Sequence, residues 1–547
     1  MSTASDRSKA ASPFSPFAHS AFAVMWVATV ASNIGTWMND VGGGWLMTSL
    51  TTDPRWVALV PAATQLPIFL FALLAGALGD LYDRRRLLIW CQFGMGIVAT
   101  VLGFLVTQDL VTPPLLLLFA FLLGTGAAFS MPAFQAIVPK LVPKAELSNA
   151  IAANGIGINV SRALGPALGG AVIAGIGLAY PFLINGVTFL AVIGALWWWK
   201  PAPDTPSARA RETVRGAMKL GLRHAGRNVA LRATLVRACA FFVFASAYWA
   251  FLPLVARQRI EAGPTFYGIM LGSIGVGAVI TALLMPRIRA KIGDEWLSRL
   301  GTVLTGVGLV LFAIATKPLL GVFAALVCGS SWLMVMTALN VSAQTAIPDW
   351  VRARGMAVFQ MVFAGSMAGG SFLWGWVAEV WSIPTALAVS AGGIILALIL
   401  TKGFVLQQGI AIDYTPAGHW AEPQFTQEPG EDIGPVVIVI EYRVPPENIA
   451  KFTELATSLE HFRRQDGAYG WTLAEDISEP GRMLESWRED SWAAHLRTHD
   501  RVSEAVRKIQ QELDGLLEQP GSRIVQHLLP PDPKRKPADH GLKRGYN

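Results

Sequence analysis

The chain has 547 residues, of which 53% are hydrophobic and only 15% are charged. Soluble domains carry roughly 25% charged residues, so this composition excludes an ordinary soluble protein and indicates a membrane protein. The basic residues behind the formal net charge of +7 lie next to apolar runs, which indicates a membrane surface and not nucleic acid as their partner. The three cysteines lie inside apolar runs, which favours small buried side chains over a disulfide or metal framework: Cys91, Cys239 and Cys328.

The chain begins with a polar, Ser-rich stretch, residues 1–16, which we predict to be a disordered tail. The apolar run that follows is long and lacks a small-residue cleavage site. We therefore interpret it as a membrane helix and not as a signal peptide.

Apolar runs long enough to cross a bilayer, about 20 residues each, recur as far as Leu406. We predict about twelve spanning helices, near 19–49, 56–79, 87–107, 113–135, 148–175, 180–199, 234–257, 266–288, 297–316, 319–342, 355–380 and 384–406. Residues 200–233 interrupt the series, which predicts two six-helix halves, 17–199 and 234–406.

The positions of Lys and Arg predict the orientation of these helices. Most basic residues follow even-numbered runs, so those ends are expected in the cytoplasm together with both termini. Arg257 and Arg259, after the seventh run, are the exception. Two five-residue segments, Gln135–Pro139 and Gln344–Pro348, are similar in sequence. Their similarity indicates that the two halves are related, which is a common transporter plan.

The composition changes after the last apolar run. Residues 407–432 have the Pro, Gly and acidic content of a linker. Residues 433–529 alternate strand and helix patterns in the order β-α-β-β-α-β, which predicts a small cytoplasmic ferredoxin-like α+β domain. The Pro-rich, basic tail 530–547 is expected to be disordered.

A cluster of charges follows the second apolar run, in the sequence GALGDLYDRRR. It can act only as a determinant of topology, or it can form a gating latch between helices. The candidate gating residues are Gly76, Asp80, Asp83, Arg84, Arg85 and Arg86.

This loop resembles the signature of the major facilitator superfamily, G-x-x-x-D-[RK]-x-G-R-[RK]. Gly76, Asp80, Arg84 and Arg85 match it, whereas Leu81 and Asp83 replace a basic residue and a glycine. The resemblance implies twelve helices in two halves that rock about a central site.

A second motif, in the fifth run, resembles the Gly-Pro-x-x-Gly-Gly pattern of antiporter-type members of that superfamily. Its residues are Gly165, Pro166, Gly169 and Gly170. The resemblance implies export, and the alternative interpretation is close helix packing by small residues.

Ionisable and amide side chains inside apolar runs predict the substrate or ion pathway, because burying them in a bilayer is costly. The candidates are Asn33, Asn39, Asp40 and Arg162. Drug-exporting relatives often carry an Arg four residues before a Gly of the fourth helix; here that Gly is Gly124, and Ala120 stands at the Arg position. This departure puts the usual arrangement for proton antiport in question.

The loop between the halves carries basic residues at every fourth position, Arg211, Arg215, Lys219, Arg223 and Arg227. This spacing puts them on one helical face, which suits the anionic inner leaflet of a membrane.

The C-terminal domain resembles the antibiotic-biosynthesis-monooxygenase type of dimeric α/β barrel, through its strand order and the segment around Trp492. His495 and His499 have the spacing of a ligand pair, but without a third ligand this is weak evidence, and the favoured interpretation is that they are packing or barrel-mouth residues. The domain is therefore an enzyme, a regulatory module or a means of self-association.

The whole pattern predicts a secondary transporter, not an enzyme, with no cofactor. It resembles the enterobactin-exporter-like branch of the superfamily over about residues 17–406. The implied function is export of a hydrophobic or amphipathic small molecule, a siderophore or drug, across the bacterial inner membrane. No nucleotide-binding motif is visible, so the expected energy source is an ion gradient, with protons as the coupling ion.

Overall fold

The structure is a computed structural model that describes residues 14–81, 83–200, 214–348, 351–406, 417, 420, 433–499 and 502–530. Most of the two predicted tails and of the predicted linker lie outside these residues. The chain divides into two compact units. The first, here the membrane unit, comprises 1–218, 233–344 and 353–408, and the second unit comprises 219–232, 345–352 and 409–547.

Within the described residues, eleven helices are long and apolar enough to cross a membrane. They are α1 (Ser20–Leu50), α2 (Pro54–Leu81), α3 (Arg84–Thr107), α4 (Pro113–Ile137), α5 (Leu147–Ile176), α6 (Tyr180–Trp198), α8 (Val229–Leu254), α9 (Pro264–Ile314), α10 (Pro318–Ala346), α11 (Arg352–Val380) and α12 (Ile383–Leu400). Several begin with proline, whose missing N–H is not needed in the first helical turn.

Helix α9 joins two of the predicted spans. It runs for 51 residues, about 77 Å at 1.5 Å per residue, which is more than twice the thickness of the hydrocarbon core. The helical backbone is interrupted at Gly293, where φ is 71° and ψ is 172°. Only glycine adopts this conformation readily, and the ion pair of Arg289 with Asp294, 2.6 Å long, spans the break. A glycine kink therefore replaces the loop expected between residues 288 and 297.

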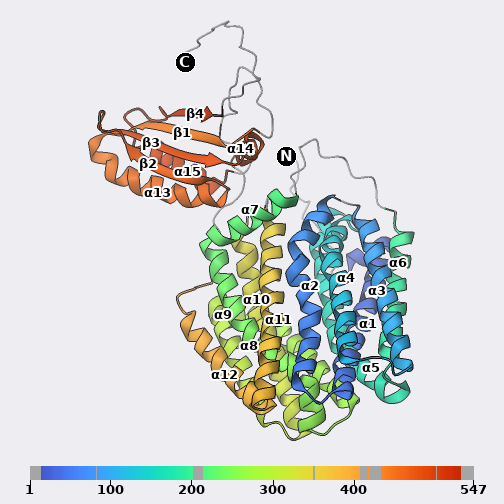
Figure 1. Cartoon of the computed structure of the whole chain (residues 1–547). Helices are drawn as coiled ribbons and strands as arrows, with labels where there is room; N and C mark the ends of the chain where they lie inside the picture. The colour runs from blue at the N-terminus through green and yellow to red at the C-terminus, as the bar shows by residue number, and fades with distance from the viewer. Residues whose placement is uncertain are drawn as a thin grey trace, which may run out of the picture. The chain divides into compact units, whose positions relative to one another are not determined.

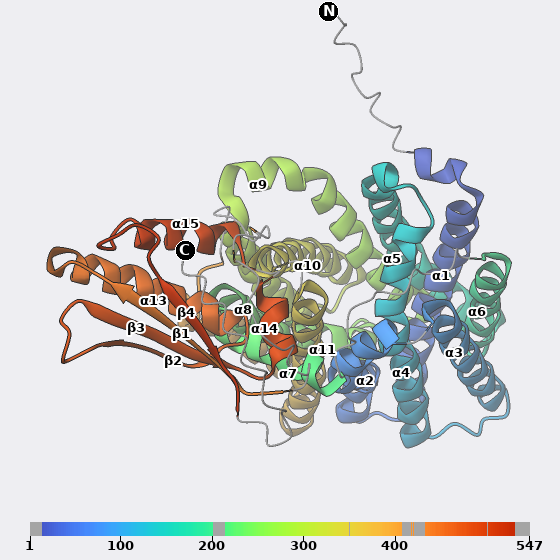
Figure 2. The same cartoon turned by 90° about the horizontal axis from the view of Figure 1, so that it is seen from above.

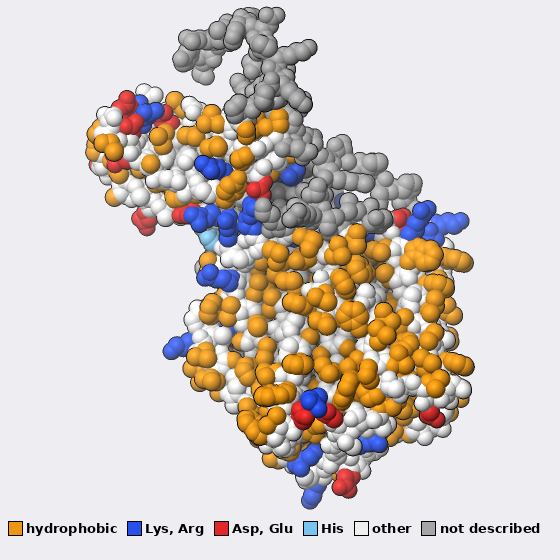
Figure 3. Space-filling view, viewed as in Figure 1, with side chains coloured by type: hydrophobic (Ala, Val, Ile, Leu, Met, Phe, Trp, Pro, Cys, Tyr) orange, Lys and Arg blue, Asp and Glu red, His pale blue; other side chains and the backbone are white. Residues whose placement is uncertain are grey.

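The helices of the membrane unit pack in chain-order groups, with α1–α6 beside one another and α8–α12 next to them (Figure 2). Helix α1 packs against α5 and α6, α2 against α4, and α5 against α9. The surface of this unit seen in Figure 3 is largely apolar, with charged side chains gathered toward its ends. Large side chains such as Trp90, Phe104 and Leu283 are more than half exposed, as expected of a surface that faces lipid.

The second unit holds a four-stranded antiparallel sheet (Figure 1). Its elements are β1 (Val436–Arg443), α13 (Ile449–Gln465), β2 (Tyr469–Glu475), β3 (Arg482–Glu489), α14 (Trp492–His499), α15 (Glu504–Asp514) and β4 (Ile524–Leu528). The strand order is β2-β3-β1-β4, so β2 and β4 form the edges. The second helix of the predicted β-α-β-β-α-β order is instead two helices, α14 and α15.

The core of this sheet follows from alternation along β1. Val436, Ile438 and Ile440 are buried, while the residues between them are only half-buried. Successive strand residues point to opposite faces, so one face of β1 packs on the core. Phe452 of α13 and Val506 of α15 belong to the same buried cluster.

Candidate functional site

A small pocket, with a cavity volume of about 40 Å³, lies among α1, α2, α3, α4 and α6 of the membrane unit. Two of the predicted pathway residues, Asn39 and Asp40, line it, and Asp40 is exposed. Ala120 lines the same pocket, so the position where drug exporters often carry Arg faces this carboxylate with a methyl group. Asn33 is not among the lining residues, which are Asn39, Asp40, Gly43, Val60, Thr64, Leu102, Leu116, Ala120, Leu123 and Phe182.

Arg162 lies in α5 and faces aromatic rings. Its guanidinium lies 5.8 Å from the centre of the Trp37 ring of α1, and Trp37 stacks on Trp249 of α8 at 6.4 Å. Its Nε is buried and has no hydrogen-bond partner among the described residues. Within that part of the chain no ion pair joins Arg162 to Asp40, the other ionisable residue of the predicted pathway. A half-buried cation that forms no ion pair with a described carboxylate is a candidate anion site.

An aromatic cluster continues from Trp249 across three helices. The Trp332 ring of α10 lies 5.6 Å from that of Trp249, 5.4 Å from that of Phe242 and 6.2 Å from that of Phe363 in α11. The sequence analysis missed this cluster. The 19 tryptophans were the available signal, but their partners lie on different helices.

The Gly-Pro-x-x-Gly-Gly motif brings three helices close together. A Cβ on Gly165 would lie 2.5 Å from the Cβ of Trp37, and one on Gly169 would lie 3.0 Å from the Cα of Met38, both on α1. A Cβ on Gly170 would lie 2.6 Å from the carbonyl oxygen of Pro264 in α9. The helix α9 contributes its own glycine, since a Cβ on Gly268 would meet the carbonyl oxygen of Pro166 at 2.5 Å. Close packing is thus observed, while the link of this motif with export stays a prediction.

Polar contacts join the two helix groups of the membrane unit at one end. Arg55 of α2 pairs with Glu379 of α11 at 2.8 Å. Arg257 donates to the hydroxyl of Ser49 at 2.7 Å and lies 5.4 Å from the centre of the Trp45 ring. The distribution of Lys and Arg predicted few basic residues at this end of the helices. The partners of Arg55 and Arg257 explain why these two lie there.

The charged loop after α2 is held by one local bond and by bonds to the end of α6. Asp83 is the N-cap of α3, because its carboxylate accepts from the backbone N–H of Arg86 at 2.8 Å. Arg85 donates to the carbonyl oxygens of Leu196, at 2.6 Å, and Trp197, at the end of α6. The glycine expected at position 83 is therefore replaced by a residue with a capping role.

The other latch residues are less constrained. A Cβ on Gly76 would have no heavy atom of the described residues within 4 Å, so no helix approaches it in this conformation. The side chains of Asp80 and Leu81 lie outside the described part of the chain. The latch therefore stays a prediction.

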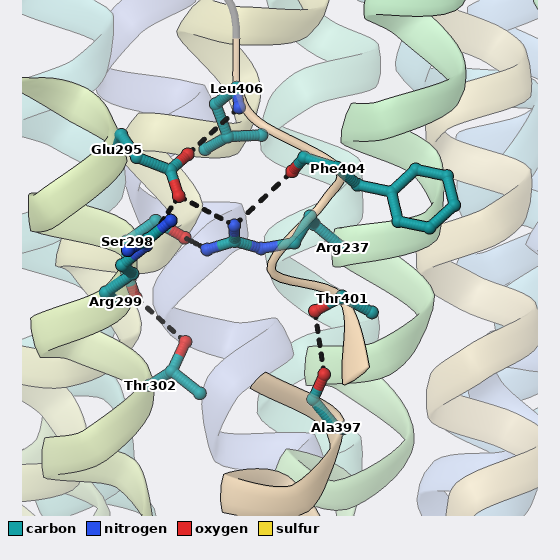
Figure 4. Close-up of polar contacts among 9 residues, drawn as sticks. All are labelled: Arg237, Glu295, Ser298, Arg299, Thr302, Ala397, Thr401, Phe404 and Leu406. Atoms are coloured by element: carbon teal, nitrogen blue, oxygen red, sulfur yellow. Dashed lines mark hydrogen bonds and ion pairs between the residues drawn. The ribbon is translucent and has the colours of Figure 1, made fainter. Parts of the chain in front are cut away.

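A second buried arginine, which the sequence analysis missed, forms a polar network (Figure 4). Arg237 of α8 bonds Glu295 of α9 at 2.9 Å, the hydroxyl of Ser298 at 3.3 Å and the carbonyl oxygen of Phe404 at 3.4 Å. Glu295 also accepts from the backbone N–H of Leu406 at 2.9 Å. The network ties α8 and α9 to the chain that follows α12.

In the second unit, residues 219–232 contact the end of α13. Arg223 donates to the carbonyl oxygen of Gly467 at 2.9 Å, and Arg227 to that of Ala468 at 2.6 Å. His224 lies between them, with Nδ1 3.1 Å from the carbonyl oxygen of Gln465, and burial lowers the pKa of its imidazole.

The five-residue basic stripe is thus only partly described. Two of its arginines bind backbone carbonyls of the protein in place of the lipid headgroups expected for them. Arg211 and the side chains of Arg215 and Lys219 lie outside the described part, so for these three the membrane-surface role stays a prediction.

The sheet of the second unit carries a buried carboxylate with several donors. Glu485 accepts from the hydroxyl of Tyr442 at 2.8 Å and from the indole of Trp471 at 3.0 Å, and it pairs with Arg463 at 3.4 Å. The Arg463 guanidinium lies 4.3 Å from the centre of the Trp487 ring. With these partners, Glu485 has the surroundings of a structural core residue.

Within the described residues, one group of side chains could hold a metal ion. His495 and His499 of α14 are joined by His527 of β4, and their ligand atoms all lie within 4.8 Å of one another. The helical spacing of the first two was visible in the sequence, whereas the third depends on how β4 packs.

The helical fold defines the class of protein. A nucleoside transporter structure, NupG, is similar with a TM-score of 0.54 and 14% identity, over 70% of this chain and 98% of that one. A POT family transporter in complex with 5-aminolevulinic acid is similar with a TM-score of 0.58 and 12% identity, over 70% of this chain and 96% of that one. These likenesses show the fold of a multi-pass membrane transporter.

A family profile described as "Transmembrane secretion effector" matches residues 11–534, and the chain belongs to this family of major facilitator transporters. The staphyloferrin A transporter of Staphylococcus aureus is 24% identical, over 65% of this chain and 89% of its own length. The enterobactin exporter EntS of Salmonella typhimurium is 25% identical, over 70% of this chain and 92% of its own length.

Proposed function

We propose that this protein exports a hydrophobic or amphipathic small molecule, of the siderophore or drug class, across the bacterial inner membrane. Relatives named as a siderophore transporter and a siderophore exporter support this substrate class. In this proposal α9 counts as two spans, which gives twelve helices in two six-helix halves. Both termini then lie in the cytoplasm.

The observation that carries the proposal is a half-buried arginine among aromatic rings, whose Nε is buried. Arg162, next to Trp37 and Trp249, offers a cation and flat apolar surfaces in one place. A molecule with an anionic group and an apolar or aromatic body complements both features. Arg162 would bind the anionic group, and the cluster around Trp332 would contact the body.

Transport would proceed by alternating access. The contacts of Arg55 with Glu379 and of Arg257 with Ser49 would hold the two halves together at the end proposed to face outward. The tight packing between Gly170 and Pro264 would act on the same side of the central site. Release of substrate to the outside then requires these contacts to break.

Asp40 is the proposed carrier of the coupling proton. It is an exposed carboxylate within the pocket, and within the described residues it forms no ion pair. A carboxylate that loads and releases a proton as the pocket alternates between the two sides would couple export to the proton gradient.

An efflux assay in a bacterial strain that lacks its own siderophore exporters tests the proposal. Expression of the chain is expected to raise extracellular siderophore, and Asp40→Asn is expected to lower that export. Asp109→Asn, in the loop after α3, is the matched control and should export normally. Export that stays at the level of the empty strain contradicts the function, and normal export by Asp40→Asn at every pH removes Asp40 from the pathway.

A second proposal concerns residues 433–529, as a ferredoxin-like regulatory module. The bonds from Arg223 and Arg227 to the end of α13 support it, because residues 219–232 lead directly into α8. The half-exposed apolar residues on the second face of β1, Val437 and Val439, also suit self-association.

Deletion of residues 430–547 separates this role from the alternative of a membrane-anchored monooxygenase. A module that regulates transport should change the rate of efflux when removed. An enzyme should instead show oxygen consumption by the purified full-length chain with a quinol-like substrate, lost on deletion. Unchanged efflux after deletion contradicts regulation.

A further inference from the structure

Three imidazoles converge in the second unit from two elements that are distant in sequence. His495 and His499 lie one turn apart on the same face of α14, and their Nε2 atoms are 3.1 Å apart. His527 lies on the edge strand β4, with its ring centre 4.7 Å from that of His495. The ligand atoms of all three lie within 4.8 Å of one another.

These distances suit a tetrahedral metal centre. With metal–nitrogen bonds of 2.0–2.1 Å, two nitrogen ligands of a tetrahedral ion are roughly 3.3 Å apart. The pair on α14 already has about this separation. The ligand atom of His527 lies within 4.8 Å of those of the other two histidines, so it must come closer to complete a three-nitrogen face.

A buried carboxylate lies next to Nδ1 of His495, the ring nitrogen that does not face His499. Oε2 of Glu489 lies 3.4 Å from Nδ1 of His495, which leaves Nε2 as the atom directed at His499. Glu489 is itself fixed by the indole of Trp487 at 3.0 Å and by the hydroxyl of Thr498 at 3.2 Å. A carboxylate behind a histidine ligand is the arrangement that orients and strengthens such ligands in metal sites.

Packing alone does not account for this arrangement. The ring centre of Trp492 lies 5.6 Å from that of His495 and 6.0 Å from that of His527. Aromatic side chains therefore already fill the space around the histidines. Burying polar ring nitrogens next to one another costs free energy unless they have partners. His495 is 1% exposed, and a metal ion would bind its Nε2 in place of the contact with Nε2 of His499.

We propose that His495, His499 and His527 bind one divalent first-row transition-metal ion, with Glu489 positioning His495. Imidazole ligands select zinc, iron, cobalt, nickel or copper over calcium and magnesium, which prefer oxygen. Three protein ligands leave a coordination position for water or for a small ligand. Binding would tie α14 to the edge strand β4, so the metal would stabilise this unit.

The test uses the full-length chain in detergent, without a histidine tag and stripped by a chelator. Titration with Co²⁺ is expected to give one bound ion per chain and the visible absorption of a four-coordinate centre, which Zn²⁺ then displaces. His499→Ala and His527→Ala are expected to abolish that spectrum, and Glu489→Gln to weaken binding by about 10–100-fold. His461→Ala, on α13 of the same unit, is the matched control and should bind like the parent.

Thermal unfolding with and without Zn²⁺ keeps the proposal testable if an alanine variant folds poorly. The parent is expected to unfold at a higher temperature with Zn²⁺, and His527→Gln, which keeps a polar side chain of similar size, is expected to show no such gain. A parent chain that binds no Co²⁺ overturns the proposal. So does equal Co²⁺ binding by the parent, His499→Ala and His527→Ala.

Discussion

Two arginines lie within helices of the membrane unit, Arg237 buried and Arg162 half-buried, and their surroundings differ. Arg237 bonds a carboxylate, a hydroxyl and a carbonyl oxygen (Figure 4). Arg162 faces Trp37, and its Nε has no hydrogen-bond partner among the described residues. A buried charge that the protein neutralises serves the fold, whereas one left open to aromatic walls can serve a ligand. We therefore expect loss of Arg237 to affect stability and loss of Arg162 to affect transport.

The largest expected effect follows removal of Arg237. Arg237→Ala removes one of the two arginines that pair with Glu295 and leaves Arg299, at 2.6 Å, as the other, so we expect a loss of about 3 kcal/mol in the free energy of unfolding. Thermal unfolding of the purified chain in detergent measures this. The double variant Arg237→Met with Glu295→Gln removes both charges and should recover much of the loss. If Arg237→Ala alone is as stable as the parent, this network does not stabilise the fold.

Arg162→Ala is expected to change transport and not stability. Loss of a bond from a charged group to the substrate is worth about 1.5–3 kcal/mol, which corresponds to a loss of tenfold or more in apparent affinity. Efflux measured across a range of substrate concentrations gives this value. Arg162→Lys keeps the charge and should retain more activity. Equal, near-normal activity of both variants would leave Arg162 with a packing role only.

A smaller effect is expected at the contact between α5 and α9. The Cβ added by Gly170→Ala would lie 2.6 Å from the carbonyl oxygen of Pro264, so the helices must separate, at a cost of about 1–3 kcal/mol. Gly175→Ala is the matched control on the same helix, because its added Cβ meets nothing within 4 Å. Unfolding temperatures of the two variants provide the comparison. Equal values would contradict the close contact.

The smallest expected effect is a dependence on pH in the second unit. Burial lowers the pKa of the His224 imidazole below its usual value of 6.5. The unfolded chain then binds more protons than the folded one just below pH 6.5, so stability should fall as the pH drops through this value. His461 contributes in the same direction, since burial lowers its pKa too.

Unfolding curves of the full-length chain between pH 7.5 and 5.5, recorded with a chelator, measure this dependence. His224→Gln cannot titrate and should flatten part of it. If stability depends on pH equally in this variant and in the parent, the contact with Gln465 does not depend on a neutral imidazole.

The sequence predicted local features well and long-range partners poorly. The four strands expected within residues 433–529 are β1, β2, β3 and β4, because alternation and turn residues are local signals. The partner of Arg237 was missed because Glu295 is 58 residues away. His527 was missed as a neighbour of His495 for the same reason, since only the pairing of β4 with β1 brings it near.

Three residues carried more local information than the prediction used. Asp83 stands directly before a helix, three residues ahead of Arg86, which is the spacing of an N-cap. Gly293 marked the kink in α9, where only a glycine readily adopts the observed backbone angles. Arg237, an arginine inside an apolar run, had the same signal as Arg162.

Transport by the purified chain in proteoliposomes tests the central claim most directly. With a proton gradient imposed across inside-out vesicles, the account predicts gradient-dependent accumulation of a siderophore by the parent chain and a loss of tenfold or more at low substrate concentration in Arg162→Ala. Arg237→Ala molecules that remain folded should still transport. Accumulation no greater than in empty liposomes, or equal transport by the parent and Arg162→Ala, would contradict the account.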